Sequence, residues 1–175
     1  MSKTVILKIF LVTLILLGCN DVVSTKENQV DKKNISIVPK EERSDNYIIE
    51  QKVYVPIYSD IYSQTKDVRF QLTATLSIRN ISPTDTLFIN TVNYHNTVGD
   101  KVRSYVTQPI FLKPLETLDY VIEQEDTEGG TGANFIIDWA AKKELKPLFQ
   151  AVMIGVVGQQ GFAFTTEGIA ISSSP

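Results

Sequence analysis

The segment best able to support chemistry is Glu125–Asn134, which reads Glu-Asp-Thr-Glu-Gly-Gly-Thr-Gly-Ala-Asn. The carboxylates of Glu125, Asp126 and Glu128, together with backbone carbonyls, are the oxygen donors that calcium prefers, and a calcium ion takes about six to eight of them. Calcium is therefore the one cofactor that the sequence suggests, with these three residues as its candidate ligands. Their spacing does not match that of an EF-hand loop.

The second half of this segment suggests a different site. Successive backbone amides at Gly129, Gly130 and Gly132, with Asn134, can form a loop that binds an anion or another small ligand, although the preceding carboxylates would repel an anion. A third interpretation needs no ligand: the segment is a long connection whose glycines adopt positive φ values and whose acids are solvated. We favour this third interpretation and keep calcium and ligand binding as alternatives.

Catalytic signatures are weak. His95 is the sole histidine, so a Ser-His-Asp triad would have to use it, and a histidine-rich zinc site is excluded. It stands just before a turn predicted at Asn96–Asp100, where a surface or turn-stabilising histidine is the commoner role. The chain has no G-x-S-x-G, H-E-x-x-H or Walker-type motif. We assign no catalytic residue, and a hydrolase that uses carboxylates of Glu125–Asn134 is the enzymatic alternative.

Cys19 predicts a covalent modification. Residues 1–18 have a basic start, then a short apolar stretch, and no acidic residue, which is the layout of a signal peptide. Leu16-Leu17-Gly18-Cys19 follows the lipobox pattern, in which an aliphatic residue and a small residue precede the modified cysteine. We therefore expect cleavage before Cys19, the only cysteine, and a diacylglyceryl group on its thiol.

Lipidation predicts a protein of the bacterial cell envelope, whose first partner is the membrane. Acyl chains anchor a protein stably without a membrane span, and the apolar stretch is shorter than the roughly 20 residues that a spanning helix needs. Asn20 is not the aspartate that retains lipoproteins at the inner membrane of enteric bacteria. The outer membrane is therefore favoured for a Gram-negative cell.

Charge argues against nucleic acid as a partner. The whole chain has 17 Lys and Arg against 20 Asp and Glu, and removing two lysines with residues 1–18 leaves 15 − 20 = −5. Nucleic-acid binding depends on clustered basic residues, and no basic stripe is present. With Cys19 acylated, no thiol remains for a disulfide, so the domain must be stabilised by its core.

The chain divides by composition into a leader, a polar stretch without aromatic residues, and a segment rich in Val, Ile, Thr, Tyr and Phe. The first two parts predict a signal peptide and a flexible tether, within which Ile35, Ile37 and Val38 can form a short docking strand. The parts are a signal peptide (1–18), a lipidated N-terminus and tether (19–46), a folded domain (47–172) and a disordered tail (173–175).

Strand patterns dominate the folded domain. The alternation in Gln71–Asn80, where Leu72 and Leu76 face one way and Thr73 and Thr75 the other, predicts a half-buried strand. No segment has an amphipathic helical stripe of ten or more residues, although Lys142–Lys146 fits one helical turn. We predict an all-β fold, an immunoglobulin-like antiparallel β-sandwich of about eight strands paired as consecutive hairpins. The expected strands are Tyr47–Tyr58, Gln71–Asn80, Thr86–His95, Lys101–Thr107, Ile110–Leu112, Leu115–Glu125, Asn134–Trp139, Leu148–Val157 and Phe162–Ser172.

The aromatic residues can either form an exposed binding surface or lie in the core. Tyr54, Tyr58 and Tyr62 recur every fourth residue and can form an exposed patch for a protein or glycan partner, but burial between sheets is the commoner fate. Phe135 and Trp139 are expected in or near the core.

Several segments resemble a known family. The resemblance lies in Val53-Tyr54-Val55-Pro56-Ile57-Tyr58-Ser59, Leu72-Thr73-Ala74-Thr75-Leu76-Ser77-Ile78-Arg79-Asn80, Gly129-Gly130-Thr131-Gly132-Ala133-Asn134-Phe135 and Ala151-Val152-Met153-Ile154-Gly155. Together they are similar to the bacterial family catalogued as domain of unknown function 3124. The resemblance implies an exported protein, often a lipoprotein, with no established activity, so it transfers no catalytic residue. The expected function is a lipid-anchored, non-catalytic module that binds an envelope protein or glycan.

Overall fold

The computed structural model describes residues 36–38 and 46–173, and in these residues every regular element is a β-strand. No helix long and apolar enough to cross a membrane occurs in them. The thirteen strands are β1 (Ser36–Ile37), β2 (Ile49–Pro56), β3 (Asp60–Ser63), β4 (Thr65–Gln71), β5 (Thr73–Arg79), β6 (Leu87–His95), β7 (Lys101–Val106), β8 (Ile110–Leu112), β9 (Thr117–Ile122), β10 (Asn134–Ala141), β11 (Leu148–Val157), β12 (Gln160–Glu167) and β13 (Ile169–Ser173).

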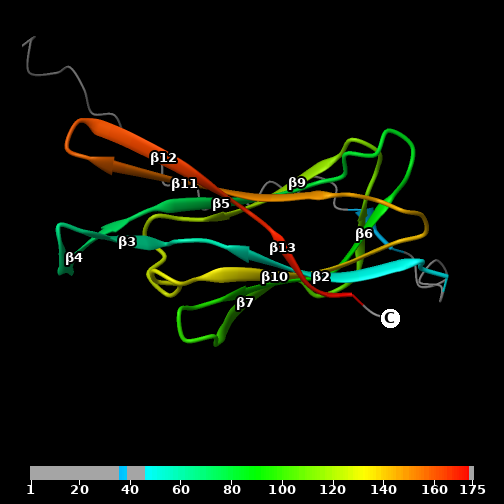
Figure 1. Ribbon diagram of the computed structural model, residues 1–175, viewed down its shortest axis with the longest axis horizontal. Helices are drawn as coiled ribbons and strands as arrows, with labels where there is room; N and C mark the ends of the chain where they lie inside the picture. Colours follow the sequence, from blue (N-terminus) through cyan, green and yellow to red (C-terminus); the bar gives the residue numbers. More distant parts are fainter. Residues whose placement is uncertain (1–35, 39–45, 174–175) are drawn as a thin grey trace, which may run out of the picture. The chain divides into compact units, whose positions relative to one another are not determined.

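Two antiparallel sheets face each other and a short hairpin extends from them (Figure 1). The larger sheet has the order β1-β8-β6-β10-β2-β13, with β7 also paired to β6. The smaller sheet has the order β12-β11-β5-β9, and β3 pairs only with β4. The prediction of an all-β antiparallel sandwich is therefore confirmed. It has more strands than the expected eight or so because the β3–β4 hairpin was not predicted and Phe162–Ser172 divides into two strands.

The core lies between the two sheets. The inward side chains of β5 (Leu72, just before it, and Ala74, Leu76 and Ile78) are fully buried, as the alternation predicted. From the larger sheet, Phe135 and Trp139 of β10 are buried in the same core, which confirms the expectation for these two aromatic residues. Alternate residues of a strand face opposite sides, so the outward residues of β5 are the threonines and serine between them.

Strand pairing was the weaker part of the prediction. Consecutive hairpins account for β3–β4, β6–β7 and β11–β12, but β10 lies between β6 and β2, and β5 lies between β9 and β11. The expected single strand Phe162–Ser172 is two strands in different sheets, divided at Gly168. A Cβ on Gly168 would lie 2.7 Å from Val53 Cγ1 and 2.9 Å from Phe149 Cβ, so only glycine allows the chain to cross there. Lys142–Lys146 forms no helical turn.

The short docking strand expected near Ile37 is present. Ser36–Ile37 pairs with β8, Val38 N donates to Pro109 O at 2.9 Å, and the Val38 side chain is buried beside Phe88 and Ala140. The domain thus includes three residues that the sequence assigned to the tether, and β13 reaches Ser173, one residue into the predicted tail. The predicted signal peptide, Cys19 and the rest of the tether lie outside the described residues.

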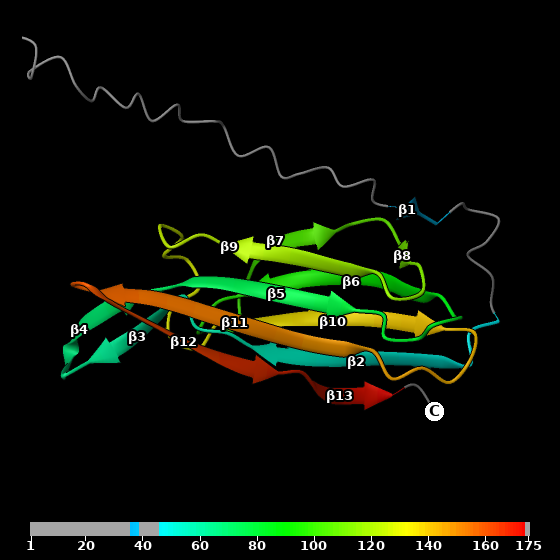
Figure 2. The same cartoon turned by 90° about the horizontal axis from the view of Figure 1, so that it is seen from above.

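The strand registers define two ends of the sandwich (Figure 2). At one end, which we call the β1 end, β1 pairs with β8 and β8 pairs with the first residues of β6, Leu87–Ile89. At the other end, β2 leads into the β3–β4 hairpin, and β11 continues beyond its last pairing with β5, Ile154 opposite Thr73, to the turn before β12. We call this the hairpin end.

Candidate functional site

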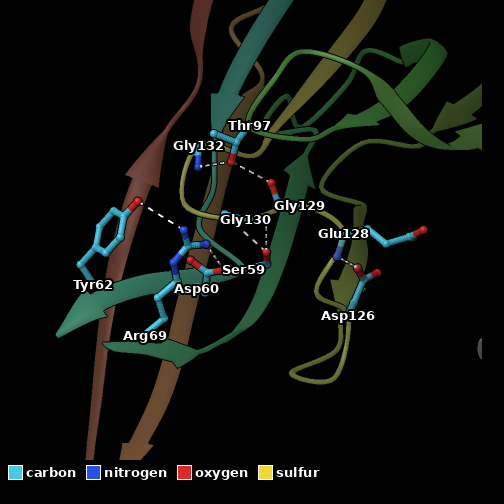
Figure 3. A network of polar contacts seen from close by, with 10 residues as sticks. All are labelled: Ser59, Asp60, Tyr62, Arg69, Thr97, Asp126, Glu128, Gly129, Gly130 and Gly132. Carbon is cyan, nitrogen blue, oxygen red and sulfur yellow. Dashed lines mark hydrogen bonds and ion pairs between the residues drawn. The ribbon is translucent and has the colours of Figure 1, made fainter. Parts of the chain in front are cut away.

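The glycine-rich segment, for which ligand binding was an alternative, forms hydrogen bonds with other parts of the domain (Figure 3). Gly130 N donates to Ser59 Oγ at 2.7 Å, and Gly132 N donates to Thr97 Oγ1 at 2.9 Å. Thr97 Oγ1 in turn donates to Gly129 O at 2.9 Å. We call these five residues the glycine clasp. Because two hydroxyls occupy these amides, the clasp joins the β2–β3 link and the β6–β7 turn instead of presenting an open anion site.

Close packing explains why a glycine occupies position 129. It is buried, and a Cβ at this position would lie 1.9 Å from the hydroxyl oxygen of Tyr94. The ligand-free interpretation expected positive φ values for these glycines; Gly130 has one, +78°, whereas Gly129 and Gly132 do not. Asn134 is buried on β10, opposite Pro56 and His95. The glycines of the clasp thus contact other parts of the domain.

In the acidic half of the segment, one arginine pairs with two of the three carboxylates. Arg103 Nη2 lies 3.0 Å from Asp126 Oδ2 and 3.4 Å from Glu128 Oε2, and the Glu128 backbone N–H donates to Asp126 Oδ1 at 3.1 Å. Glu125 is exposed. Within residues 36–38 and 46–173, no group of three or more His, Cys, Asp or Glu is placed to hold a metal ion. The geometry therefore gives the calcium hypothesis no support.

Two cavities of the domain lie away from this segment. One cavity of about 530 Å³ lies at the β1 end, lined by residues that include Asp85, Phe88 and Lys143. A second, of about 320 Å³, lies beside Trp139 and Phe149. No residue of Glu125–Asn134 lines either cavity. His95 is half-buried at the end of β6, and its Nδ1 has no hydrogen-bond partner among the described residues.

A buried aromatic cluster lies under the clasp. The rings of Tyr94 and Phe135 are 5.4 Å apart and those of Tyr105 and Tyr120 are 4.7 Å apart, centroid to centroid. Burial, with a smaller contribution from the charge of Asp126, raises the pKa of Tyr94 to about 12. Burial, then the neighbouring Tyr105, raises the pKa of Tyr120 to about 12.

These pKa values predict loss of stability at alkaline pH. A tyrosine of the unfolded chain ionises near pH 10. Between pH 10 and 12 the unfolded chain therefore releases protons that Tyr94 and Tyr120 of the folded protein retain, and unfolding becomes more favourable.

The Tyr94 hydroxyl has no partner at hydrogen-bonding geometry in the described part of the chain. Tyr94→Phe should therefore change the free energy of unfolding by less than about 1 kcal/mol at pH 7. It should also raise the pH at which the protein unfolds; chemical denaturation from pH 7 to 12 measures both, and an unchanged alkaline midpoint would contradict the argument.

The hairpin end exposes aromatic residues that the sequence analysis placed in the interior. Tyr58 is 36% exposed and Tyr62 is 54% exposed, so the preference for burial was wrong for both. The guanidinium of Arg69 lies 4.9 Å from the centre of the Tyr62 ring and bridges the Tyr62 hydroxyl and Asp60, each at 3.4 Å (Figure 3). The repeat of tyrosines indicated this surface, whereas nothing in the sequence indicated its arginine.

The β11–β12 hairpin adds apolar side chains at the same end. Ile154, Val156 and Val157 are exposed, and no charged residue occurs from Pro147 through Thr166. Tyr58 packs edge-on against Phe164 of β12, with ring centroids 5.7 Å apart, so the two hairpins are in contact. We define the hairpin-end surface as the exposed residues Tyr58, Tyr62, Val68, Arg69, Ile154, Val156 and Val157.

Comparisons with known proteins place the chain in a family. No curated protein matches it. A solved structure described as the crystal structure of Thermotoga maritima 1070 is similar over 71% of this chain and 97% of its own, with 13% sequence identity and a TM-score of 0.43. The family described as "Protein of unknown function (DUF3124)" matches residues 50–171, which span β2 to β13. The match covers more than half of the chain, and the chain therefore belongs to the DUF3124 family of proteins of unknown function.

Proposed function

We propose that this chain is a lipid-anchored protein of the bacterial cell envelope, without catalytic activity, whose hairpin end binds an envelope protein. Cys19 would carry the lipid, and the residues between Cys19 and Ser36 would tether the sandwich to a membrane. The outer membrane is the proposed location in a Gram-negative cell.

One observation carries this proposal: the sequence that follows Cys19 joins the sandwich at the β1 end, and the hairpin-end surface lies at the opposite end (Figure 2). A flexible tether attached at the β1 end would leave the hairpin end free to reach a partner. Exposed apolar and aromatic side chains at that end would then be available to a partner.

The composition of the hairpin-end surface suits a protein. Tyrosine and arginine are enriched at the centres of protein interfaces, where charged residues other than arginine are depleted. Arg69 is held over Tyr62, so little side-chain freedom is left to lose on binding. By contrast, two carboxylates of the hydrolase alternative, Asp126 and Glu128, are paired with Arg103, and the third, Glu125, is exposed.

Crosslinking in the native envelope tests the proposal. The full-length chain would be expressed in its own host, crosslinked, and purified with whatever it captures. A protein captured by the wild type should be reduced at least about tenfold by Val156→Lys, which places a charge on the hairpin-end surface. Ile81→Lys is the matched control, since Ile81 is 53% exposed in the loop after β5, at the β1 end.

The lipid anchor needs a separate readout. Cys19→Ser should move the protein from the membrane fraction to the soluble fraction, because loss of the acyl chains removes the anchor. A wild type that captures nothing, or a partner equally reduced by Ile81→Lys and Val156→Lys, would contradict binding through the hairpin end. Capture of envelope glycan in place of protein would reject the proposed partner.

A further inference from the structure

Strand β12 is the terminal strand of the smaller sheet, since it pairs with β11 and with no other strand of the described residues. It is eight residues long, and its register with β11 is regular from Gln160 to Glu167. Its only charged residue is Glu167, at its end. A terminal strand of this kind presents a row of unpaired backbone groups that can pair with another polypeptide.

The register identifies which backbone groups face outward. The turn between β11 and β12 has two residues, Gly158 and Gln159, and φ of Gly158 is +61°, as in the tight hairpin turns that begin with glycine. After β12, Gly168 N donates to Phe149 O at 2.8 Å. Antiparallel pairs alternate between bonded and non-bonded, so the bonded residues of β12 are Gln160, Phe162, Phe164 and Thr166.

The backbone N–H and C=O groups of the remaining residues therefore point away from β11. These residues are Gly161, Ala163, Thr165 and Glu167, and all of them are exposed. Phe162 and Phe164 pack against the core, which fixes the strand in place. The outer edge of β12 is thus a rigid row of backbone donors and acceptors.

Other terminal strands in the described residues have features that discourage pairing. β4 carries Lys66, Asp67 and Arg69, and its ladder with β3 is irregular. β7 carries Lys101 and Arg103 and has two register shifts against β6. β13 has a register shift after Ala170, β9 has Asp119 in its middle, and β1 has only two residues. Charges and bulges of this kind protect sheet edges from added strands. β12 has no register shift, and its one charged residue, Glu167, is its last.

We propose that β12 binds an extended, uncharged segment of a partner protein as a fifth strand of the smaller sheet. Main-chain hydrogen bonds to Gly161, Ala163 and Thr165 would supply the pairing, as in other recognition by β-strand addition. The absence of charge along β12 selects a segment without charges in its middle. This inference rests on the proposed function and specifies how the hairpin end recognises its partner.

The proposed occupant is a strand from a different protein, because the proposed function gives the hairpin end an envelope-protein partner. Antiparallel pairing of two β12 strands about a two-fold axis is the alternative occupant, and a wild-type dimer that Ala163→Pro dissociates would identify it.

A synthetic strand peptide tests the inference without knowledge of the partner. The probe is a peptide of alternating threonine and valine with a lysine at each end, and its control is the same peptide N-methylated at every residue between the lysines, so that neither edge of the extended peptide can donate. With the full-length chain in detergent, saturating probe should slow backbone hydrogen exchange at Ala163 and Thr165 at least about tenfold. The N-methylated peptide should leave both rates unchanged, because it cannot form the ladder.

Variants at the edge separate main-chain pairing from side-chain packing. Ala163→Pro removes an outward N–H without removing a bond to β11, and it should abolish the slowing at Thr165. Ala163→Val keeps the N–H and should behave as the wild type. Thr165→Lys, which places a charge at the edge, is the second variant if the proline variant is not folded by circular dichroism.

Three results would overturn the inference: the probe does not slow hydrogen exchange, the N-methylated peptide slows it equally, or the wild type forms a dimer that Ala163→Pro dissociates.

The crosslinking experiment distinguishes pairing at β12 from the proposed function. A partner lost with Val156→Lys but retained with Ala163→Pro and Thr165→Lys would leave the proposed function standing and reject pairing at β12. If the peptide protects Ala163 but the chain captures no partner in the envelope, pairing at β12 would stand and the proposed function would be rejected.

Discussion

Asn80→Ala should lower the free energy of unfolding by about 3 kcal/mol. Asn80 is 2% exposed, and its Nδ2 lies 2.7 Å from Asp85 O, 3.1 Å from Leu112 O and 3.0 Å from Lys113 O. Its Oδ1 accepts from Ser82 N at 3.1 Å. One amide thus satisfies the backbone of the β5–β6 loop and of the β8–β9 connection, and its removal leaves buried carbonyls without a donor.

Asn96→Ala is the matched control for this change. Asn96 also binds backbone through its side chain, since Oδ1 accepts from Val98 N and Asp100 N, but these bonds lie in an exposed turn. Water can replace an exposed hydrogen bond, so the expected loss is about 1 kcal/mol. Equilibrium denaturation in urea measures the stability of both variants. Equal losses of unfolding free energy would show that burial of the Asn80 hydrogen bonds does not add to their contribution.

The sequence predicts those parts of the fold whose side chains alternate along the strand. In β5 and β9, apolar residues face the core at every second position, and both strands were predicted within two or three residues of their ends. In β10, Phe135 and Trp139, which the sequence analysis expected in or near the core, are buried as well. Local alternation suffices here because each of these strands has one face on the core.

The β3–β4 hairpin illustrates where alternation gives no signal. Thr65–Arg69 is exposed at every position, so the pattern lacks a buried face and resembles a loop. Arg69 reaches Tyr62 and Asp60 only once the hairpin has formed. A surface built on an exposed hairpin therefore escapes a method that depends on burial.

The glycine clasp illustrates a second limit. The sequence singled out Gly129, Gly130 and Gly132 as unusual, but their partners Ser59 and Thr97 are separated from them by 71 and by 32 to 35 residues. No local pattern connects a serine after β2 with a glycine before β10. Whether such glycine amides bind a ligand or a hydroxyl of the chain itself depends on tertiary structure, so the sequence could identify the loop without deciding its role.

Gly129→Ala should destabilise the protein by about 3 kcal/mol, the upper part of the range for overpacked positions. The added Cβ would lie 1.9 Å from the hydroxyl oxygen of Tyr94 and 2.9 Å from Ala133 Cβ. Tyr94 is fully buried and packs against Phe135, so its ring cannot move aside and the loop must shift instead. That shift would strain the bonds of Gly129 O and Gly130 N within the clasp.

Two comparisons identify the Tyr94 contact as the cause. Gly161→Ala adds the same methyl group where the nearest atom is 3.9 Å away, so its stability should stay within about 0.5 kcal/mol of the wild type. Combining Gly129→Ala with Tyr94→Phe removes the oxygen that the methyl group meets, although the ring carbon at 2.8 Å remains. The double variant should therefore recover part of the lost stability, a coupling that a double-mutant cycle measures directly. Additive effects of the two changes would show that Gly129 is needed for its backbone conformation and not for its approach to Tyr94.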